Sequence, residues 1–173
     1  MASTLRIPIR ERDHLAGDLS AKIKLIEYGD YQCPHCGDAY AILKQIQKEH
    51  GSSLLFVFRN FPLTEVHPFA MQAAIAAEAA ALQNKFWEMH DIIYENQSKL
   101  GKGGLFNMAK KINLDIDRYK KDIADENLQT KVENDFEGGM RSGVNFTPSF
   151  FIDGKKFDGG AQDLYQFLKQ SNF

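Results

Sequence analysis

Cys33 and Cys36 are the two cysteines of this 173-residue chain, and Pro34 and His35 separate them. A disulfide stabilises a fold mainly by restricting the unfolded chain, and closing so short a gap restricts it very little. A structural bridge is therefore a weak explanation for the pair. Two thiols at this spacing are typical of thiol–disulfide exchange, or of one half of a zinc site.

The histidines do not complete such a zinc site. The chain has five of them, and the sequence shows no second pair of ligands at the usual spacing. They are His14, His35, His50, His67 and His90. We therefore expect redox chemistry that needs neither a metal nor an organic cofactor.

The segments around the cysteines predict that the pair lies at the start of a helix. Residues 22–28, KIKLIEY, begin with the alternation of a strand, and an apolar stripe after the motif predicts a helix that ends near His50. Pro34 suits the first helical turn, where its missing N–H costs nothing. Residues 54–58, LLFVF, predict a buried strand, so the segment forms a right-handed βαβ unit.

The remainder of the chain predicts a helical block followed by a ββα unit. Residues 63–143 carry several helical patterns without a strand signal between them. Two short strand candidates then flank Asp153 and Gly154, which is a strong hairpin signal, and residues 161–170 predict a closing helix. Residues 1–13 are expected to form an arm or edge segment.

This order of elements, combined with three sequence phrases, resembles the DsbA-like thiol:disulfide oxidoreductases over about residues 14–170. The phrases are EYGDYQCPHCG, FRNFPL and GVNFTPSFFIDG. The resemblance implies an α/β, thioredoxin-like fold, with βαβ then ββα around a central mixed sheet and an inserted helical subdomain. Within one domain of residues 1–173, the two halves are expected at 14–62 and 144–173, with the insertion at 63–143.

The helix mouth predicts different roles for the two sulfurs. Unsatisfied backbone N–H groups and the helix dipole would stabilise a thiolate on Cys33, the expected nucleophile, and His35 would add to this if it is protonated or donates an N–H. Cys36 lies one turn inward. It is expected to be the less exposed sulfur and to resolve the mixed disulfide between Cys33 and the substrate.

Further site residues follow from the resemblance. Glu27 takes the place of a buried acid beneath the two sulfurs, where it could relay the proton of Cys36 with a pKa raised toward neutrality. The alternative is an exposed glutamate at the end of a strand. The resemblance also implies a cis bond between Thr147 and Pro148, with the Thr147 backbone pairing to an extended substrate. The alternative there is an ordinary trans turn.

Aromatic residues could line a peptide groove, but most are expected in the core. Phe146 is the exception, since it neighbours Thr147 and is expected near the site. His67 and His90 are expected at the surface or at helix ends, without a catalytic role. The other aromatic candidates considered are Phe61, Trp87, Phe150 and Phe151.

Composition narrows the classes of partner. The formal net charge of −2 gives no sign of a polyanion-binding surface, so nucleic acid is not an expected partner. No stretch approaches the roughly 18 apolar residues of a membrane helix, and we expect no membrane insertion. The N-terminal segment lacks the apolar run of a signal peptide. The chain as written is thus expected in the cytoplasm, or in a periplasmic or other extracytoplasmic space if a leader has been removed.

The sequence therefore predicts an enzyme that exchanges disulfides with protein or peptide thiols, together with a redox partner that recycles the cysteine pair. Three alternatives stay open. One is a reductase or isomerase direction of the same chemistry, and another is a redox-sensing or binding module that uses the pair as a switch. The third is a glutathione-using branch that transforms small molecules, although such proteins do not usually need the second cysteine.

Overall fold

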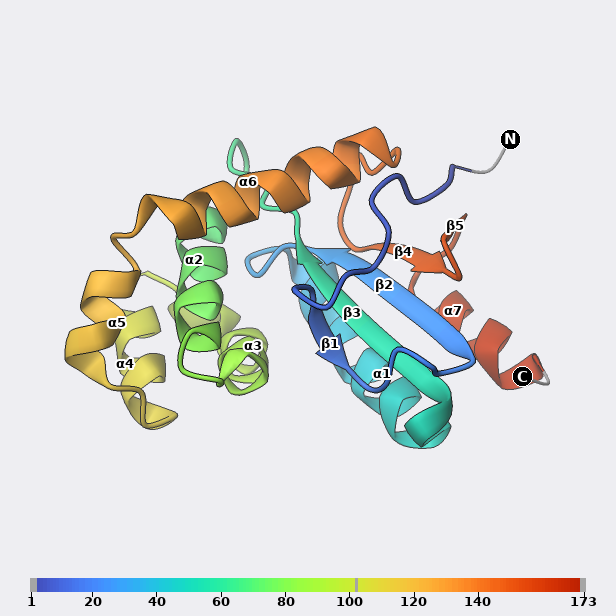
Figure 1. The fold of residues 1–173 in the computed structure, drawn as a ribbon, viewed down its shortest axis with the longest axis horizontal. Helices are drawn as coiled ribbons and strands as arrows, with labels where there is room; N and C mark the ends of the chain where they lie inside the picture. Colours follow the sequence, from blue (N-terminus) through green and yellow to red (C-terminus); the bar gives the residue numbers. More distant parts are fainter. Residues whose placement is uncertain (1–2, 102, 172–173) are drawn as a thin grey trace.

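The computed structural model describes residues 3–101 and 103–171. The first two residues of the expected arm, residue 102 of the expected insertion and the last two of the C-terminal half lie outside the described residues. Figure 1 shows a twisted sheet on one side of the molecule and a group of helices on the other. In chain order the elements are β1 (His14–Ala16), β2 (Ile23–Gly29), α1 (Pro34–His50), a 3₁₀ turn (Gly51–Ser53), β3 (Leu54–Asn60), α2 (Ala70–Ala81), α3 (Phe86–Glu95), a second 3₁₀ turn (Gln97–Lys99), α4 (Gly104–Lys111), α5 (Ile116–Asp122), α6 (Glu126–Arg141), β4 (Ser149–Ile152), β5 (Lys155–Phe157) and α7 (Ala161–Gln170).

The strands form one mixed sheet in the order β1-β3-β2-β4-β5. β2 and β3 are parallel, whereas β1 pairs antiparallel with β3, β4 with β2, and β5 with β4. The predicted βαβ and ββα units are both present, and so is the helical insertion between them. β1 was not predicted, because its three residues are too few to carry an alternating pattern.

The two faces of the sheet are covered by different segments. On one face α1 packs Ala39, Leu43 and Ile46 against strand residues such as Ile23 and Leu25. The other face is covered by the N-terminal arm, which runs across the sheet in Figure 1, and by α6.

The predicted hairpin is also confirmed, since φ is +47° at Asp153 and +79° at Gly154, as a tight two-residue turn requires.

Small side chains let the helices of the insertion approach one another and the sheet. α2 is largely alanine and is buried along most of its length. α6 extends from the insertion over the edge of the sheet (Figure 1). There a Cβ at Gly139 would lie 2.7 Å from the ring of Phe61 and 3.0 Å from that of Tyr28. A larger residue at Gly139 would push α6 away from the sheet.

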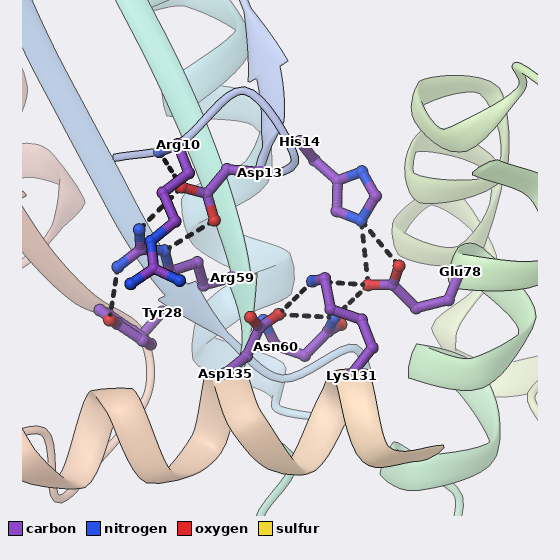
Figure 2. A network of polar contacts seen from close by, with 9 residues as sticks. All are labelled: Arg10, Asp13, His14, Tyr28, Arg59, Asn60, Glu78, Lys131 and Asp135. Atoms are coloured by element: carbon purple, nitrogen blue, oxygen red, sulfur yellow. Dashed lines mark hydrogen bonds and ion pairs between the residues drawn. The ribbon is translucent and has the colours of Figure 1, made fainter. Parts of the chain in front are cut away.

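A buried carboxylate on α2 joins the insertion to the sheet (Figure 2). Glu78 accepts a 2.6 Å hydrogen bond from the Asn60 amide of β3, and its oxygens lie 2.9 Å from His14 Nε2 in β1. Lys131 of α6 approaches the same carboxylate to 3.2 Å. Burial raises the pKa of Glu78, but the hydrogen bond and charge of His14 and the charge of Lys131 outweigh it and hold the pKa below its usual value.

The N-terminal arm is held by a second polar centre in the same view (Figure 2). Arg59 of β3 is 2% exposed, and its Nη2 lies 2.8 Å from Asp13 Oδ2. The guanidinium also donates to the carbonyls of Ile7 at 2.8 Å and Pro8 at 3.0 Å, and to the Tyr28 hydroxyl at 3.0 Å. A planar donor fork with this many acceptors fixes the arm against β3.

Candidate active site

Cys33 is the residue that caps the N-terminus of α1, as predicted. Its backbone is extended, with φ −66° and ψ 122°, and its carbonyl accepts the N–H groups of Cys36 and Gly37, both at 3.1 Å. The helix begins at Pro34, which has no N–H to satisfy. Cys33 is 4% exposed and Cys36 is fully buried, which confirms that Cys36 is the less accessible sulfur.

The two thiols have opposite electrostatics. The pKa of Cys33 falls from 9.0 to about 5, chiefly because the Cys36 thiol hydrogen-bonds to its sulfur. The backbone N–H groups of Cys36 and His35 lower it further, while burial opposes them. The pKa of Cys36 is raised well above its usual value, first by burial and then by its hydrogen bond to Cys33. At neutral pH the pair therefore holds one thiolate and one thiol.

His35 affects Cys33 through its backbone. The imidazole is exposed, and the contribution to the lowered pKa of Cys33 comes from the His35 backbone N–H at the helix mouth. The predicted help from the His35 ring thus stays a prediction, whereas the predicted effect of the helix N-terminus is present in the geometry.

Glu27 is a buried acid, so the alternative of an exposed strand end is wrong. It is 1% exposed, and the two-residue period of β2 places it on the same sheet face as Leu25, the face that α1 covers. Its Oε1 has no hydrogen-bond partner among the described residues. Burial, followed by the negative charge of Cys33, raises the pKa of Glu27 to about 8. Glu27 can therefore carry a proton at neutral pH, as a proton relay must.

The loop before β4 faces the nucleophile from the other half of the fold. The Thr147–Pro148 bond is cis, and Cys33 Sγ lies 3.4 Å from the Thr147 carbonyl oxygen, to which it donates when it is protonated. The Thr147 side chain also lowers the pKa of Cys33. Phe146 is 54% exposed beside it. A groove of about 390 Å³ runs along this loop and is lined by Phe146, Thr147, Pro148, His35 and Ile42.

The other candidate aromatics contribute to the core, as expected. Phe61, Phe150 and Phe151 are buried, and Trp87 is partly buried against the main cluster.

The prediction that His90 lies at the surface or at a helix end is wrong. His90 is 3% exposed and its ring lies among Phe58, Trp87 and Tyr94, with Nδ1 3.1 Å from the Tyr31 hydroxyl. Burial lowers its pKa well below the usual range, so the ring is neutral. The histidine occurs in the amphipathic helix α3, and the sequence pattern did not show that its face of the helix would be enclosed by aromatic rings.

Asp30 is a site residue that the sequence analysis did not identify. It is 1% exposed, its N–H approaches the Cys36 sulfur at 3.4 Å, and its carbonyl accepts the Cys33 N–H at 3.1 Å. Its carboxylate accepts the Leu63 N–H and lies 2.8 Å from His67 Nδ1. His67 is thus a half-buried partner of the active-site loop rather than a surface residue. Gly29 and Asp30 directly follow the strand of residues 22–28 in the sequence, but the sequence carries no signal for the partners of Asp30.

Gln97, in the helical insertion, is the second residue that sequence reasoning missed. Its side-chain amide donates to the carbonyls of Tyr31 and Cys33, each at 2.9 Å. A Cβ at Gly37 would overlap the Gln97 amide, so glycine there leaves room for the contact. The insertion therefore holds the backbone of the nucleophile directly.

Two further findings concern the described part of the chain alone. No group of three or more His, Cys, Asp or Glu side chains is arranged there to hold a metal ion. No helix there has the length and apolar character needed to cross a membrane.

Comparisons with known proteins agree with this geometry. A family model described as Thioredoxin matches residues 10–170. BdbD from Bacillus subtilis, in its oxidised form, superposes with a TM-score of 0.83 at 23% identity, covering 98% of this chain and 96% of that one. A variant of alpha-DsbA1 from Wolbachia pipientis, in which two cysteines are replaced by alanine, gives a TM-score of 0.76 at 25% identity, covering 96% of this chain and 98% of that one.

A curated relative is much longer than this chain. The Na⁺/H⁺ antiporter NhaA 1 of Salinispora arenicola is 38% identical over 156 residues, which make up 90% of this chain and 24% of that protein. The chain thus spans about a quarter of the length of the curated relatives it matches.

Proposed function

The chain belongs to the thioredoxin family and is DsbA-like, and on that premise we propose that it is a thiol:disulfide oxidoreductase acting on protein or peptide thiols and disulfides. The observation that carries the proposal is the pair of opposite pKa shifts: the pKa of Cys33 is lowered to about 5 and that of Cys36 is raised. A surface cysteine pair without a catalytic role would not need this separation.

When the enzyme oxidises a substrate, a substrate thiolate attacks Cys33 Sγ of the Cys33–Cys36 disulfide. The bond between the two enzyme sulfurs breaks, the electron pair goes to Cys36, and a mixed disulfide forms. A second substrate thiolate then attacks the substrate sulfur and releases Cys33 as a thiolate. Its low pKa makes it a good leaving group, so this direction is favoured. In the reducing direction the same steps run backwards, and Cys36 resolves the mixed disulfide.

Glu27 is assigned the proton transfers of Cys36. Cys36 leaves as a thiolate but is a thiol at rest, because burial raises its pKa, so it needs one proton as the enzyme disulfide opens. A carboxyl with a pKa of about 8, whose Oε1 has no fixed partner among the described residues, can give that proton and take it back. The Thr147 backbone and the groove beside Phe146 are assigned to the extended substrate segment.

The compartment determines which direction the cell uses. A stabilised thiolate favours the reduced enzyme and so makes the disulfide form a donor of oxidising equivalents. The lowered pKa of Cys33 therefore suits the extracytoplasmic alternative better than a reducing cytoplasm. In either place a second redox protein must return the pair to its starting state after each turnover.

Turnover tests the proposal. The disulfide form of the protein, with glutathione disulfide as final oxidant, should oxidise a fluorescent dithiol peptide over many cycles. Cys33→Ser should abolish the reaction, and Cys36→Ser should accumulate a mixed disulfide detectable by mass. A protein that reacts once per molecule and does not turn over with any oxidant would contradict the proposal.

That contrary result would favour a redox module that acts on one partner. The length of the NhaA relatives, which carry the matching segment as about a quarter of a longer protein, is the observation on its side. Under that alternative the cysteine pair would change state stoichiometrically, and the change would alter affinity for the partner rather than produce repeated exchange.

A further inference from the structure

A recess of about 700 Å³ opens on the helical insertion between the end of α3 and α4. Phe69, Ile92 and Met108 supply apolar surface to its lining. Lys99 and Lys111 also line it, and both side chains are exposed. The recess shares none of its lining residues with the groove beside Phe146. It is therefore a second candidate surface for a polypeptide.

The recess adjoins the nucleophile through two hydrogen bonds. Asn96 and Ser98 line it and flank Gln97, whose amide donates to the Cys33 carbonyl at 2.9 Å. On the other side, the backbone N–H of Phe69 donates to the side-chain oxygen of Gln32, the residue before Cys33, at 2.6 Å. A chain that reacts at Cys33 would thus pass close to the recess before or after the reacting cysteine.

The charge of the recess is positive and local. Lys99 and Lys111 are its charged lining residues, and no Asp or Glu lines it in the part of the chain described. Neither lysine takes part in an ion pair within that part, and Lys99 Nζ has only a 3.5 Å contact with the Asn96 side-chain oxygen. The whole chain carries a formal net charge of −2, so this patch differs in sign from the chain as a whole.

We propose that this recess binds an acidic segment of the polypeptide whose thiol or disulfide reacts at Cys33. Side-chain carboxylates of that segment pair with Lys99 and Lys111, and its aliphatic parts cover Phe69 and Met108. The inference rests on the proposed function and adds a substrate preference to it. Basic and neutral segments lack the charge complementarity and gain only the apolar contact.

The test compares two dithiol peptides that differ in charge alone. One carries Asp and Glu on both sides of its cysteines, and the other carries Asn and Gln at the same positions. The protein forms are the wild type, the double variant Lys99→Glu/Lys111→Glu, and the control Lys48→Glu/Lys155→Glu. Lys48 and Lys155 are exposed lysines on α1 and β5 that do not line the recess, so the control changes the net charge equally.

At low salt, each pair of a recess lysine and a peptide carboxylate should contribute about threefold. With two such pairs, the wild type and the control should prefer the acidic peptide about tenfold in kcat/KM. The preference should shrink as salt rises, and it should disappear or reverse in the Lys99/Lys111 variant, whose glutamates repel the acidic peptide. Equal rates for both peptides in the wild type, or an equal loss of preference in both double variants, would overturn the proposal that the recess binds an acidic segment. The proposed enzyme activity would stand in either case. A wild type that turns over neither peptide overturns both proposals. An unchanged rate with the neutral peptide shows that each variant is folded.

Discussion

The dithiol form of the protein should gain stability relative to the disulfide form as pH rises. In the reduced protein the pKa of Cys33 is lowered from 9.0 to about 5, so at pH 7 the thiolate contributes up to about 2.7 kcal/mol. Solvent screening at the mouth of the site could halve this, to about 1.4 kcal/mol. Because the folded pKa is depressed, the contribution is complete above the unfolded value and is lost as pH falls through the folded value.

The disulfide stabilises the oxidised form, and this contribution does not depend on pH. Closing its short loop restricts the unfolded chain by about 2 kcal/mol in the chain-entropy account. The reduced form should therefore overtake the oxidised form between about pH 6 and 8. Its advantage should grow by about 0.7 to 1.4 kcal/mol per pH unit across that window. At pH 7 the thiolate corresponds to roughly 30 to 60 mV in the oxidising direction.

Glu27 also titrates in this pH range. The quantity to measure is therefore the difference in unfolding free energy between the dithiol and disulfide forms. The pKa of Glu27 is raised to about 8, so its contribution is present below the unfolded value of 4.5 and is lost as pH rises through 8. The part of this loss that burial causes affects both redox forms and cancels in their difference, whereas the smaller part that the Cys33 charge causes occurs only in the dithiol form. Guanidinium unfolding of the dithiol and disulfide forms at several pH values between about 5.5 and 8 gives the gap. A gap that stays constant over this range would refute the assignment of the thiolate to Cys33.

Three further outcomes are expected. Alkylation of Cys33 in a Cys36→Ala variant should follow a pKa above 5, since the Cys36 thiol is its main stabilising partner; an unchanged profile in rate measurements against pH would contradict this. In the reducing direction, where Cys36 must lose its proton to resolve the mixed disulfide, Glu27→Gln should slow release of the mixed disulfide more than its formation in rapid-mixing experiments, and equal effects on both steps would remove the relay. Gln97→Ala should cost about 1 to 3 kcal/mol in denaturant unfolding and slow alkylation of Cys33, because two backbone carbonyls lose a donor; Gln129→Ala, on an exposed helix face, is the control and should change neither.

Local pattern predicted the parts of the site that lie close together in sequence, and the resemblance added the distant cis bond between Thr147 and Pro148. The position of Cys33 at a helix mouth follows from a strand, a proline at the first helical position and an apolar stripe, all within about thirty residues. Gln97 and Asp30 were not predictable in the same way, because their roles depend on contacts with residues far along the chain. Gln97 reaches Cys33 across 64 positions of sequence, and Asp30 reaches His67 across 37. A side-chain amide or carboxylate carries no periodic signal that would indicate such a partner.

The buried carboxylate of Glu78 has a consequence for how the molecule opens. Swinging the insertion away from the sheet would separate Glu78 from His14 and Asn60 and break hydrogen bonds to a charged carboxylate, which typically contribute about 1.5 to 3 kcal/mol each. These contacts therefore couple α2 to β3 at this junction. The slowest amide protons of α2 and β3 should consequently exchange with solvent together, as a single cooperative unit, although α2 belongs to the insertion and β3 to the N-terminal half.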